Sequence, residues 1–260
     1  MIYFAIILYI CHDFIMMKNL VVDLGNTNLK LFVFDEGKLV YNHTKSDVKS
    51  FIVEVSRTKA KFQIKNVIIS SVRNDDSLIR NLLDSLFENI VIIDSNLVFP
   101  FEIKYKTPET LGQDRLAAVS GASVLYPNKS VLVIDAGTAI TYDYIEKGKI
   151  YHGGTISPGL NIRFKALHNF TGKLPLLSIN KNLNADYGIT TNEAITLGVQ
   201  NGVLCEVKGV INAFLQKNKD LIVVFTGGDS FFFEKLIKNR IFAEPNLTAF
   251  GLNKILEINV

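Results

Sequence analysis

An internal repeat constrains the fold of this chain more than any other feature of its sequence. Residues 21–38 read VVDLGNTNLKLFVFDEGK, and residues 133–149 read VIDAGTAITYDYIEKGK. Each copy has an apolar strand, an Asp-x-Gly turn, a second strand and a turn with Gly and Lys, with a one-residue slip before that second turn. Turn residues between strand-type runs indicate hairpins, and self-similarity indicates duplicated units. The repeat therefore predicts two similar domains, each built around a hairpin.

The segments between and after the hairpins alternate between helix and strand patterns. After the first hairpin we predict helices over 45–58 and 75–87, with strands beginning at Val67 and Ile90. After the second come the Gly/Pro loop HGGTISPG, a helix from Leu160, an irregular stretch over 174–186, a helix from Thr191 and the strand LIVVF. This order predicts a mixed α/β architecture in which helices cover the sheets.

The length of 260 residues favours one or two domains, and the repeat favours two. No linker rich in Pro, Gly or Ser divides the halves, so we place the join in or near the helix at 115–125, with domains over 17–120 and 121–260. Residues 1–16 are apolar but too short to span a bilayer, and they lack a basic n-region and a cleavage site. Because Met17 opens a clean strand, we expect that translation starts at Met17 and that the start codon assigned at Met1 is too early. A protein that begins at Met17 should then be as soluble and active as the full chain.

Composition narrows the partners of this chain. The formal net charge is +3 and the basic residues are scattered, which does not fit a nucleic-acid surface. The two cysteines, Cys11 and Cys205, and the four histidines show no zinc-ligand spacing and no disulfide framework. We therefore expect a cytoplasmic protein without a membrane or nucleic-acid partner, and with tolerance for small anions.

The two Asp-x-Gly turns are candidate phosphate sites. In the first, Asp23 and Gly25 precede Asn26 and Thr27. Gly lets backbone N–H groups approach an anion, Asn and Thr add donors, and Asp can hold a hydrated Mg²⁺. One such turn is as readily an ordinary hairpin turn. The second copy repeats the chemistry with Asp135, Gly137 and Thr138, and two turns facing each other across a cleft would grip a polyphosphate from both sides.

A third turn, Thr226-Gly227-Gly228-Asp229, follows the strand LIVVF and precedes a helix-like segment. A strand followed by Gly-Gly and a helix brings backbone close to a phosphorylated or flat ligand. Two Asp-x-Gly hairpins followed by a late strand-Gly-Gly turn resemble the acetate and sugar kinase, Hsp70 and actin superfamily. The resemblance implies a duplicated ribonuclease H-like, actin-like fold with two mixed sheets, flanking helices and an interdomain cleft.

Gly112-Gln113-Asp114-Arg115 opens a helix of small residues. A carboxylate at a helix start, beside a guanidinium, is expected to stay ionised and to orient or deprotonate an attacking hydroxyl. The alternative is a capping Asp with a structural Arg partner. The run of small residues over 117–123 indicates close helix packing rather than chemistry.

Six motifs in order resemble the type III pantothenate kinase family from Met17 almost to the end of the chain: DLGNT, Gly-x-Asp-Arg, DAGTA, GGTISPG, Thr-x-x-Ala-Ile and TGGD. The resemblance implies ATP-dependent phosphorylation of pantothenate to 4′-phosphopantothenate, the first step of coenzyme A biosynthesis. It also implies a homodimer that needs Mg²⁺ and a monovalent cation, K⁺ or NH₄⁺.

The same resemblance assigns residues to roles. Asp114 would accept the proton of the pantothenate hydroxyl, and Asp135 would bind the monovalent cation. The residues that would contact ATP are Asp23, Leu24, Gly25, Asn26, Thr27, Asn28, Leu29, Lys30 and Thr138. Those that would contact pantothenate are Tyr105, Gly112, Gln113, Asp114, Arg115 and Thr191.

Two other functions share parts of this pattern. A transcriptional accessory regulator derived from the same family would keep the motifs and lose catalysis, but Asp114, Arg115 and both Asp-x-Gly turns are retained. An actin-like or Hsp70-like ATPase would use the nucleotide as a conformational switch. Such a protein would lack an acceptor site, and its chains are usually much longer.

Overall fold

The computed structural model confirms both repeated hairpins. In the first, β1 (Lys18–Leu24) pairs antiparallel with β2 (Leu29–Asp35), and in the second β7 (Val131–Ala136) pairs antiparallel with β8 (Ala139–Glu146). Asp23 lies opposite Lys30 and Asp135 lies opposite Thr141, so the loop of the second hairpin is one residue shorter. That difference in loop length accounts for the one-residue slip between the two copies.

The second turn of each copy also has the same geometry. Glu36 and Gly37 have φ of 47° and 74°, and Lys147 and Gly148 have φ of 50° and 65°. Two consecutive residues with positive φ are the mark of a type I′ hairpin, which matches the twist of the flanking strands. The two copies therefore share backbone conformation as well as sequence.

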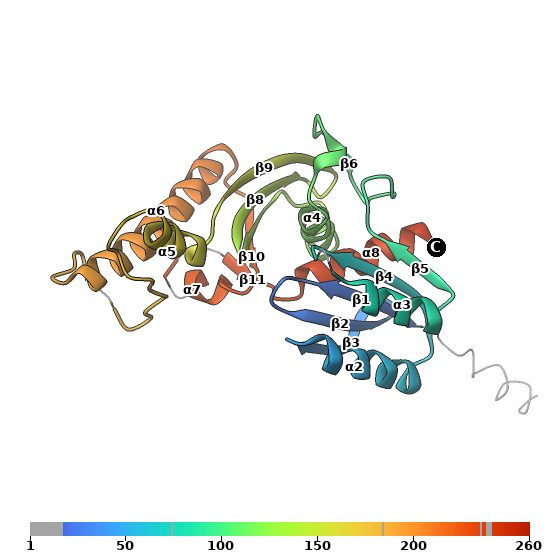
Figure 1. The fold of residues 1–260 in the computed structure, drawn as a ribbon. Helices are drawn as coiled ribbons and strands as arrows, with labels where there is room; N and C mark the ends of the chain where they lie inside the picture. The colour runs from blue at the N-terminus through green and yellow to red at the C-terminus, as the bar shows by residue number, and fades with distance from the viewer. Residues whose placement is uncertain (1–17, 74, 184, 235, 238–240) are drawn as a thin grey trace, which may run out of the picture. The chain divides into compact units, whose positions relative to one another are not determined.

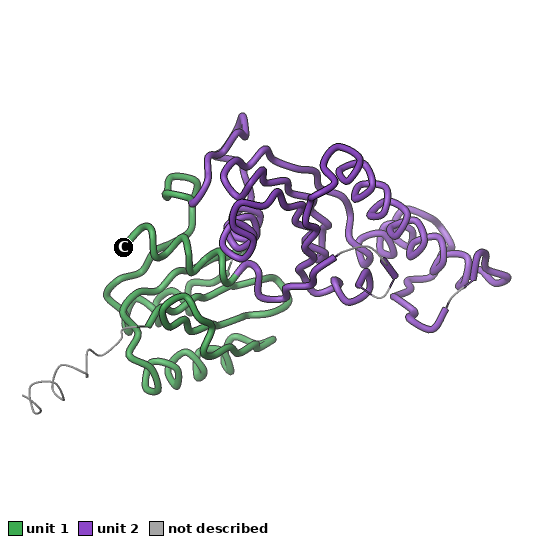
Figure 2. The backbone as a smooth tube through the Cα atoms, turned by 180° about the vertical axis from the view of Figure 1, so that it is seen from behind, with its two compact units in different colours: residues 1–99, 249–260 green, residues 100–248 purple. Residues whose placement is uncertain are grey.

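The structure describes residues 18–260 except 74, 184, 235 and 238–240, so the segment 1–16 and its predicted role lie outside the described residues. Two compact units divide the chain (Figure 2): unit 1 contains the residues up to Phe99 together with Ala249–Val260, and unit 2 contains Pro100–Thr248.

Unit 1 is a five-stranded mixed sheet in the order β3-β2-β1-β4-β5. Its remaining elements are β3 (Lys38–Lys45), α2 (Val48–Lys61), β4 (Ile64–Ser71), α3 (Ser77–Leu86) and β5 (Asn89–Ile92). The first hairpin and β3 are antiparallel, whereas β4 and β5 run parallel to β1. The predicted helices over 45–58 and 75–87 correspond to α2 and α3, with ends that differ by a few residues.

Alternation along β1 divides the core of unit 1 between two faces. Leu20, Val22 and Leu24 are buried in a cluster with residues of α2 and α3, since alternate strand residues point to the same face. The C-terminal helix α8 (Leu247–Asn259) supplies further contacts: the rings of Phe34 and Phe250 meet edge to face at 5.4 Å. The end of the chain is therefore part of the first unit.

Unit 2 repeats this topology in a six-stranded sheet with the order β11-β10-β7-β8-β9-β6. Its other strands are β6 (Glu102–Ile103), β9 (Ile150–Pro158), β10 (Ile222–Thr226) and β11 (Ile241–Ala243). With β7, β8 and β9 antiparallel and β10 and β11 parallel to β7, five of its strands match those of unit 1 one for one. The short strand β6 is an addition at the edge, parallel to β9.

Helices cover both faces of the second sheet. A buried cluster joins alternate residues of β7, β8 and β10 to α5 (Leu160–Asn169), α6 (Thr191–Lys217) and α7 (Ser230–Glu234). On the opposite face, α4 (Gln113–Leu125) packs on β7 and β8 (Figure 1). The prediction of close packing along α4 is confirmed, because a Cβ on Gly121 would overlap the backbone carbonyl of Leu247.

The segment predicted as a Gly/Pro loop is a strand. HGGTISPG lies within and just after β9, which pairs antiparallel with β8 and has a register shift at Tyr144/Ile145. Its glycines misled the sequence prediction because Gly usually interrupts strands, but a Gly in a strand also marks a close approach by a neighbour. Gly153, with φ of 100°, is such a position.

The boundary between the units differs from the predicted division at 120/121. That position falls inside α4, all of which belongs to unit 2, and the chain enters unit 2 at Pro100 and leaves it after Thr248. The reason is that α4 packs on the second sheet, whereas α8 packs on the first.

Among the described helices, none combines the length and the apolar character that crossing a bilayer requires.

Candidate active site

The first Asp-x-Gly turn lies at the end of β1 in unit 1. Asp23 is half-buried, whereas Asn26, Thr27 and Asn28 are exposed, and the turn is closed by a 3.0 Å hydrogen bond from the Gly25 N–H to the Asn28 carbonyl. The side chains of two predicted ATP contacts, Leu24 and Leu29, are buried in the core. These two leucines can therefore offer a ligand only their backbone.

Arg73, which the sequence reasoning missed, holds this first turn. It follows β4, the parallel neighbour of β1, and its Nη1 donates to the carbonyl oxygens of Gly25 at 3.3 Å and Asn26 at 3.4 Å. Carboxyl ends of neighbouring parallel strands lie at one edge of a sheet, where ligands of α/β proteins bind. The place of Arg73 after the strand was the available signal.

The second Asp-x-Gly turn and the Gly-Gly turn come together in unit 2. They follow β7 and β10, which are parallel neighbours with Asp135 beside Thr226, and the Asp229 N–H donates to the Ala136 carbonyl at 2.9 Å. Gly227 has φ of 89°, and a Cβ there would overlap Oδ1 of Asp135 and lie 2.5 Å from the Ala136 carbonyl. Only Gly lets these two turns approach so closely.

Gly159 adds a third motif to the same cluster. The last residue of GGTISPG donates its N–H to the Thr138 carbonyl at 3.0 Å, and a Cβ on Gly159 would lie 2.5 Å from that oxygen. Thr138 itself is exposed. In the Gly-Gly turn, burial raises the pKa of the Asp229 carboxyl above its ordinary value. Three sequence motifs thus form one polar surface at the carboxyl ends of β7 and β10.

Asp114 lies in the first turn of α4, with Gly112 as the residue before the helix. Its side chain is exposed, and its Oδ1 accepts a 2.8 Å hydrogen bond from the Arg115 N–H. A negative charge at a helix N-terminus is favoured by the helix dipole. The carboxylate is accessible to a ligand, as a proton acceptor must be.

Arg115 pairs with Asp143 of β8, and not with Asp114 as the sequence suggested. Its Nε donates to Asp143 at 3.0 and 3.2 Å, and its Nη2 donates at 2.6 Å. Burial acts to lower the pKa of Arg115, but the hydrogen bonds and charge of Asp143 outweigh it and hold that pKa above its ordinary value. Arg115 thus has a structural partner, as the alternative of a capping Asp with an Arg partner had it, but that partner is Asp143 and not Asp114.

Tyr105 joins the group from the segment after β6. The guanidinium of Arg115 lies 5.7 Å from the centre of its ring, within the range of a cation–π contact. A Cβ on Gly153 would lie 2.9 Å from the same ring. The structure thus brings together three of the predicted substrate contacts, Tyr105, Gly112 and Arg115, with the catalytic candidate Asp114.

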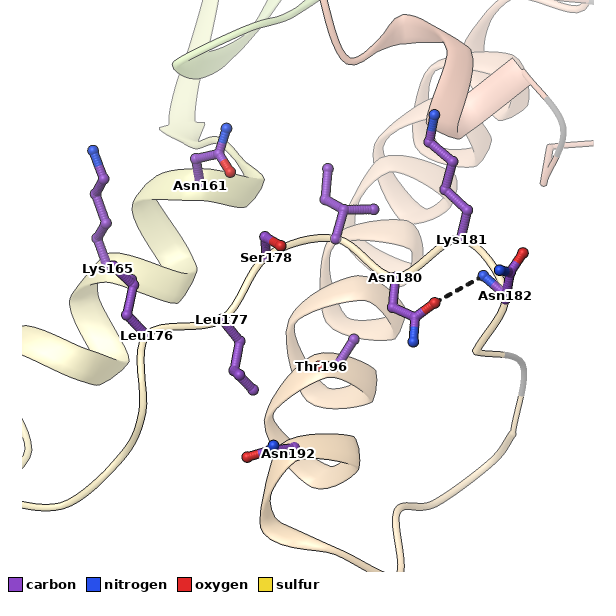
Figure 3. Close-up of a pocket in the computed structure, with 11 residues that line it drawn as sticks. Asn161, Lys165, Leu176, Leu177, Ser178, Asn180, Lys181, Asn182, Asn192 and Thr196 are labelled. Carbon is purple, nitrogen blue, oxygen red and sulfur yellow. Dashed lines mark hydrogen bonds between the residues drawn. The ribbon is translucent and has the colours of Figure 1, made fainter.

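No contact found among the described residues joins Thr191 to that group. It is the exposed first residue of α6, and its neighbour Thr190 caps the helix by accepting a 3.2 Å hydrogen bond from the Glu193 N–H. A pocket of about 840 Å³ lies between α5, α6 and the irregular segment before α6 (Figure 3), and its lining includes Lys165, Lys181 and Asn192, the residue after Thr191. None of the predicted site residues lines it.

In the described part of the chain, no three His, Cys, Asp or Glu side chains gather as a metal cluster would require. The half-buried Asp135, with carbonyl oxygens nearby, has the oxygen chemistry that suits a hard cation.

A sheet of this order, present twice with an Asp-x-Gly turn in each copy, defines the actin-like class that includes the sugar kinases. Solved structures agree on the fold. A Campylobacter jejuni protein described as a Baf family transcriptional activator has a TM-score of 0.60 and 23% identity, with 92% of this chain and 97% of that one covered. A ROK family glucokinase from Streptomyces griseus has a TM-score of 0.51 and 12% identity, with 93% and 99% covered. At these identities the likeness shows the fold alone.

Sequence comparison specifies the family. The family model described as type III pantothenate kinase matches residues 19–213. Type III pantothenate kinases from Christiangramia forsetii and Phocaeicola vulgatus are 43% and 44% identical, and each alignment covers 93% of this chain and 98% of the relative. The chain belongs to the type III pantothenate kinase family, as the order of its motifs predicted.

Proposed function

We propose that this protein transfers the γ-phosphoryl group of ATP to the primary hydroxyl of pantothenate. The observation that carries the proposal is the exposed carboxylate of Asp114 at the start of α4, next in sequence to the buried Arg115, in a chain of this family. The hydroxyl oxygen attacks the γ-phosphorus as its proton passes to Asp114, and the bond from phosphorus to the leaving oxygen of ADP breaks. Asp114 is the proton acceptor of this step.

The ATP contacts proposed for the chain divide between the two repeated turns. Asp23 to Lys30 would serve through the exposed amides and hydroxyl of the first turn, through the Lys30 ammonium and through backbone N–H groups, and Thr138 would serve through its exposed hydroxyl. Bound Mg²⁺ would neutralise phosphate charge during transfer. Tyr105, Gly112 to Arg115 and Thr191 are the proposed pantothenate contacts.

The proposed monovalent cation site is at Asp135, with K⁺ or NH₄⁺ as the ion. The close approach of Gly227 supports this assignment: a Cβ there would overlap Oδ1 of Asp135 and lie 2.5 Å from the Ala136 carbonyl oxygen, so a carboxylate oxygen and a backbone carbonyl oxygen lie near each other. A carboxylate together with backbone carbonyls is a donor set suited to a hard cation.

A homodimer that works in the cytoplasm, where ATP is available, is the proposed form of the protein. Several large apolar side chains of unit 2 are exposed, among them Phe170 at 87%, Tyr187 at 78% and Ile189 at 84%. A contiguous exposed apolar patch marks an interaction site, and we propose that these side chains contribute to one between the subunits. Sedimentation equilibrium would give a dimer mass on this proposal, and a monomer mass at working concentrations would contradict it.

The reaction is tested by its product. Purified protein with ATP, Mg²⁺, K⁺ and pantothenate should form singly phosphorylated pantothenate, detected by mass spectrometry, in equal amount to ADP. ATP consumption without phosphorylated pantothenate would show that the nucleotide serves another purpose.

A further inference from the structure

Asp143 is a buried charge that the proposed chemistry does not use. It lies in the middle of β8, its exposed fraction is 0%, and its neighbour Tyr142 faces the opposite side of the sheet, in the core with α5 and α6. Burying a carboxylate is costly unless it is paired and hydrogen-bonded. Asp143 is paired and hydrogen-bonded as this rule requires. An apolar residue would fill the same place in the sheet without needing such partners, so the charge indicates a role beyond packing.

Two side chains satisfy the Asp143 carboxylate. Arg115, 5% exposed, binds it through Nε and Nη2, and the hydroxyl of the fully buried Tyr151 donates to Oδ1 at 2.6 Å. A two-pronged guanidinium–carboxylate pair fixes the orientation of both groups. Because Nε and Nη2 are taken, the Nη1 edge is the part of the guanidinium that Asp143 does not occupy.

The neighbouring strand leaves space for this arrangement. A Cβ on Gly154 would lie 2.8 Å from Oδ1 of Asp143 and would overlap the Tyr142 carbonyl, and a Cβ on Gly153 would press on the Tyr105 ring. Both glycines belong to β9, as does Tyr151. Strand β9 therefore contributes one hydrogen-bond donor to the assembly around Arg115, and two glycines whose lack of a side chain lets Tyr105 and Asp143 come close.

We propose that Asp143, supported by Tyr151, is a positioning residue that holds the guanidinium of Arg115 in the orientation that receives the carboxylate of the acceptor substrate. The inference rests on the proposed function, because Arg115 is a proposed pantothenate contact. It adds a role for two residues that no sequence motif singled out. On this account Asp143 acts only through Arg115 and does not touch the substrate.

The test uses a pair of matched variants. Tyr151→Phe removes the hydroxyl that bonds Asp143 and keeps both members of the ion pair, so the fold is retained. Tyr142→Phe is the control, because it removes a similar buried bond, from the Tyr142 hydroxyl to Glu206 at 2.8 Å, on the other face of the same sheet. Both variants lose one hydrogen bond to a carboxylate, and only one of those carboxylates holds Arg115.

The readouts are kcat, the KM for pantothenate, the KM for ATP and the melting temperature. Tyr151→Phe should raise the KM for pantothenate by about 3- to 10-fold, a part of what a bond to a charged group is worth, with kcat and the KM for ATP close to those of the parent. Both variants should lower the melting temperature to a similar extent, but Tyr142→Phe should leave the KM for pantothenate unchanged. Asp143→Asn, if it folds, should give a larger rise than Tyr151→Phe.

Two outcomes would overturn the inference while the proposed function stands: an unchanged KM for pantothenate in Tyr151→Phe, or equal rises in both Tyr variants. An inactive parent, with no pantothenate binding by calorimetry, would instead reject the proposed function itself. The two failures are distinguishable because the second is seen without any variant.

Discussion

A methyl group on Gly112 would lie 2.5 Å from Oδ1 of Asp114. The backbone of Gly112 has φ of −58° and ψ of 133°, which any residue can adopt. Glycine is therefore needed at this position for space and not for backbone conformation. The space is occupied by the carboxylate oxygen of the proposed proton acceptor.

The first prediction is that Gly112→Ala lowers kcat by about 10-fold or more, since small displacements of a catalytic group are costly. The Asp114 side chain can rotate away from the new methyl group, so the melting temperature should change little. Steady-state kinetics and a thermal melt measure the two quantities. Gly172→Ala is the control, because nothing lies within 4 Å of its Cβ position. Unchanged kcat in Gly112→Ala would contradict the assigned geometry.

The second prediction concerns Gly159→Ala. Here the new Cβ would meet the backbone carbonyls of Gly137 and Thr138, which cannot rotate away. The variant should raise the KM for ATP and lower the melting temperature together. The helical Gly198 is the contrast, because nothing lies within 4 Å of its Cβ position and Gly198→Ala should stabilise the protein by about 0.5–1 kcal/mol. An unaltered KM for ATP in Gly159→Ala would separate this contact from nucleotide binding.

The third prediction is a pH dependence of stability. Burial raises the pKa of Asp229 in the folded protein, so the stability it contributes is present at low pH and is lost as the pH rises through its folded-state pKa. Asp229→Asn cannot ionise, and near pH 7 without nucleotide it should be more stable than the parent. Urea denaturation should show that this gain shrinks as the pH falls toward about 4. A gain that does not vary with pH would contradict the assignment.

Glu206 is the control of opposite sign. Burial acts to raise its pKa, but hydrogen bonds from Ser157, Arg163 and Tyr142 outweigh burial and lower it. The stability it contributes is therefore present at neutral pH and is lost as the pH falls through its folded-state pKa. Glu206→Gln should destabilise the protein at pH 7, and the loss should shrink in acid.

The fourth prediction tests the cation. With Mg²⁺ present, activity should rise on adding K⁺ and stay low with Na⁺ alone, and Asp135→Asn should blunt the response because it removes the charged ligand. The measurement is the rate of pantothenate-dependent ADP formation at fixed ionic strength in the two salts. Equal rates in both salts for the parent would count against a cation site at Asp135.

The repeated hairpins could be predicted from sequence because their signals are local: strand residues, turn residues and spacing. The pairing of Arg115 with Asp143 could not be predicted in this way, since 28 residues separate the two and no single motif contains both. One signal was available. An Asp in the apolar strand run ITYDYI must find a cation if it is buried, although the sequence does not say which cation.

The limits of the two units were also hidden from local patterns. Asn253 bonds Asn19 across 234 residues of sequence, and Phe250 packs on Phe34. Such contacts assign the end of the chain to the first unit. A division by order along the chain could not anticipate them, and it cut through α4, all of which belongs to the second unit and packs on the second sheet.

The fifth prediction tests the central claim, that Asp114 accepts the proton from pantothenate. The measurement is ADP formation with and without pantothenate, by the parent and by Asp114→Asn, with ATP binding followed by calorimetry. The account predicts that the parent forms ADP only with pantothenate, and that the variant loses about 10²- to 10⁴-fold in kcat while it binds ATP as the parent does. Equal ADP formation by the parent without pantothenate, or full turnover by Asp114→Asn, would contradict it.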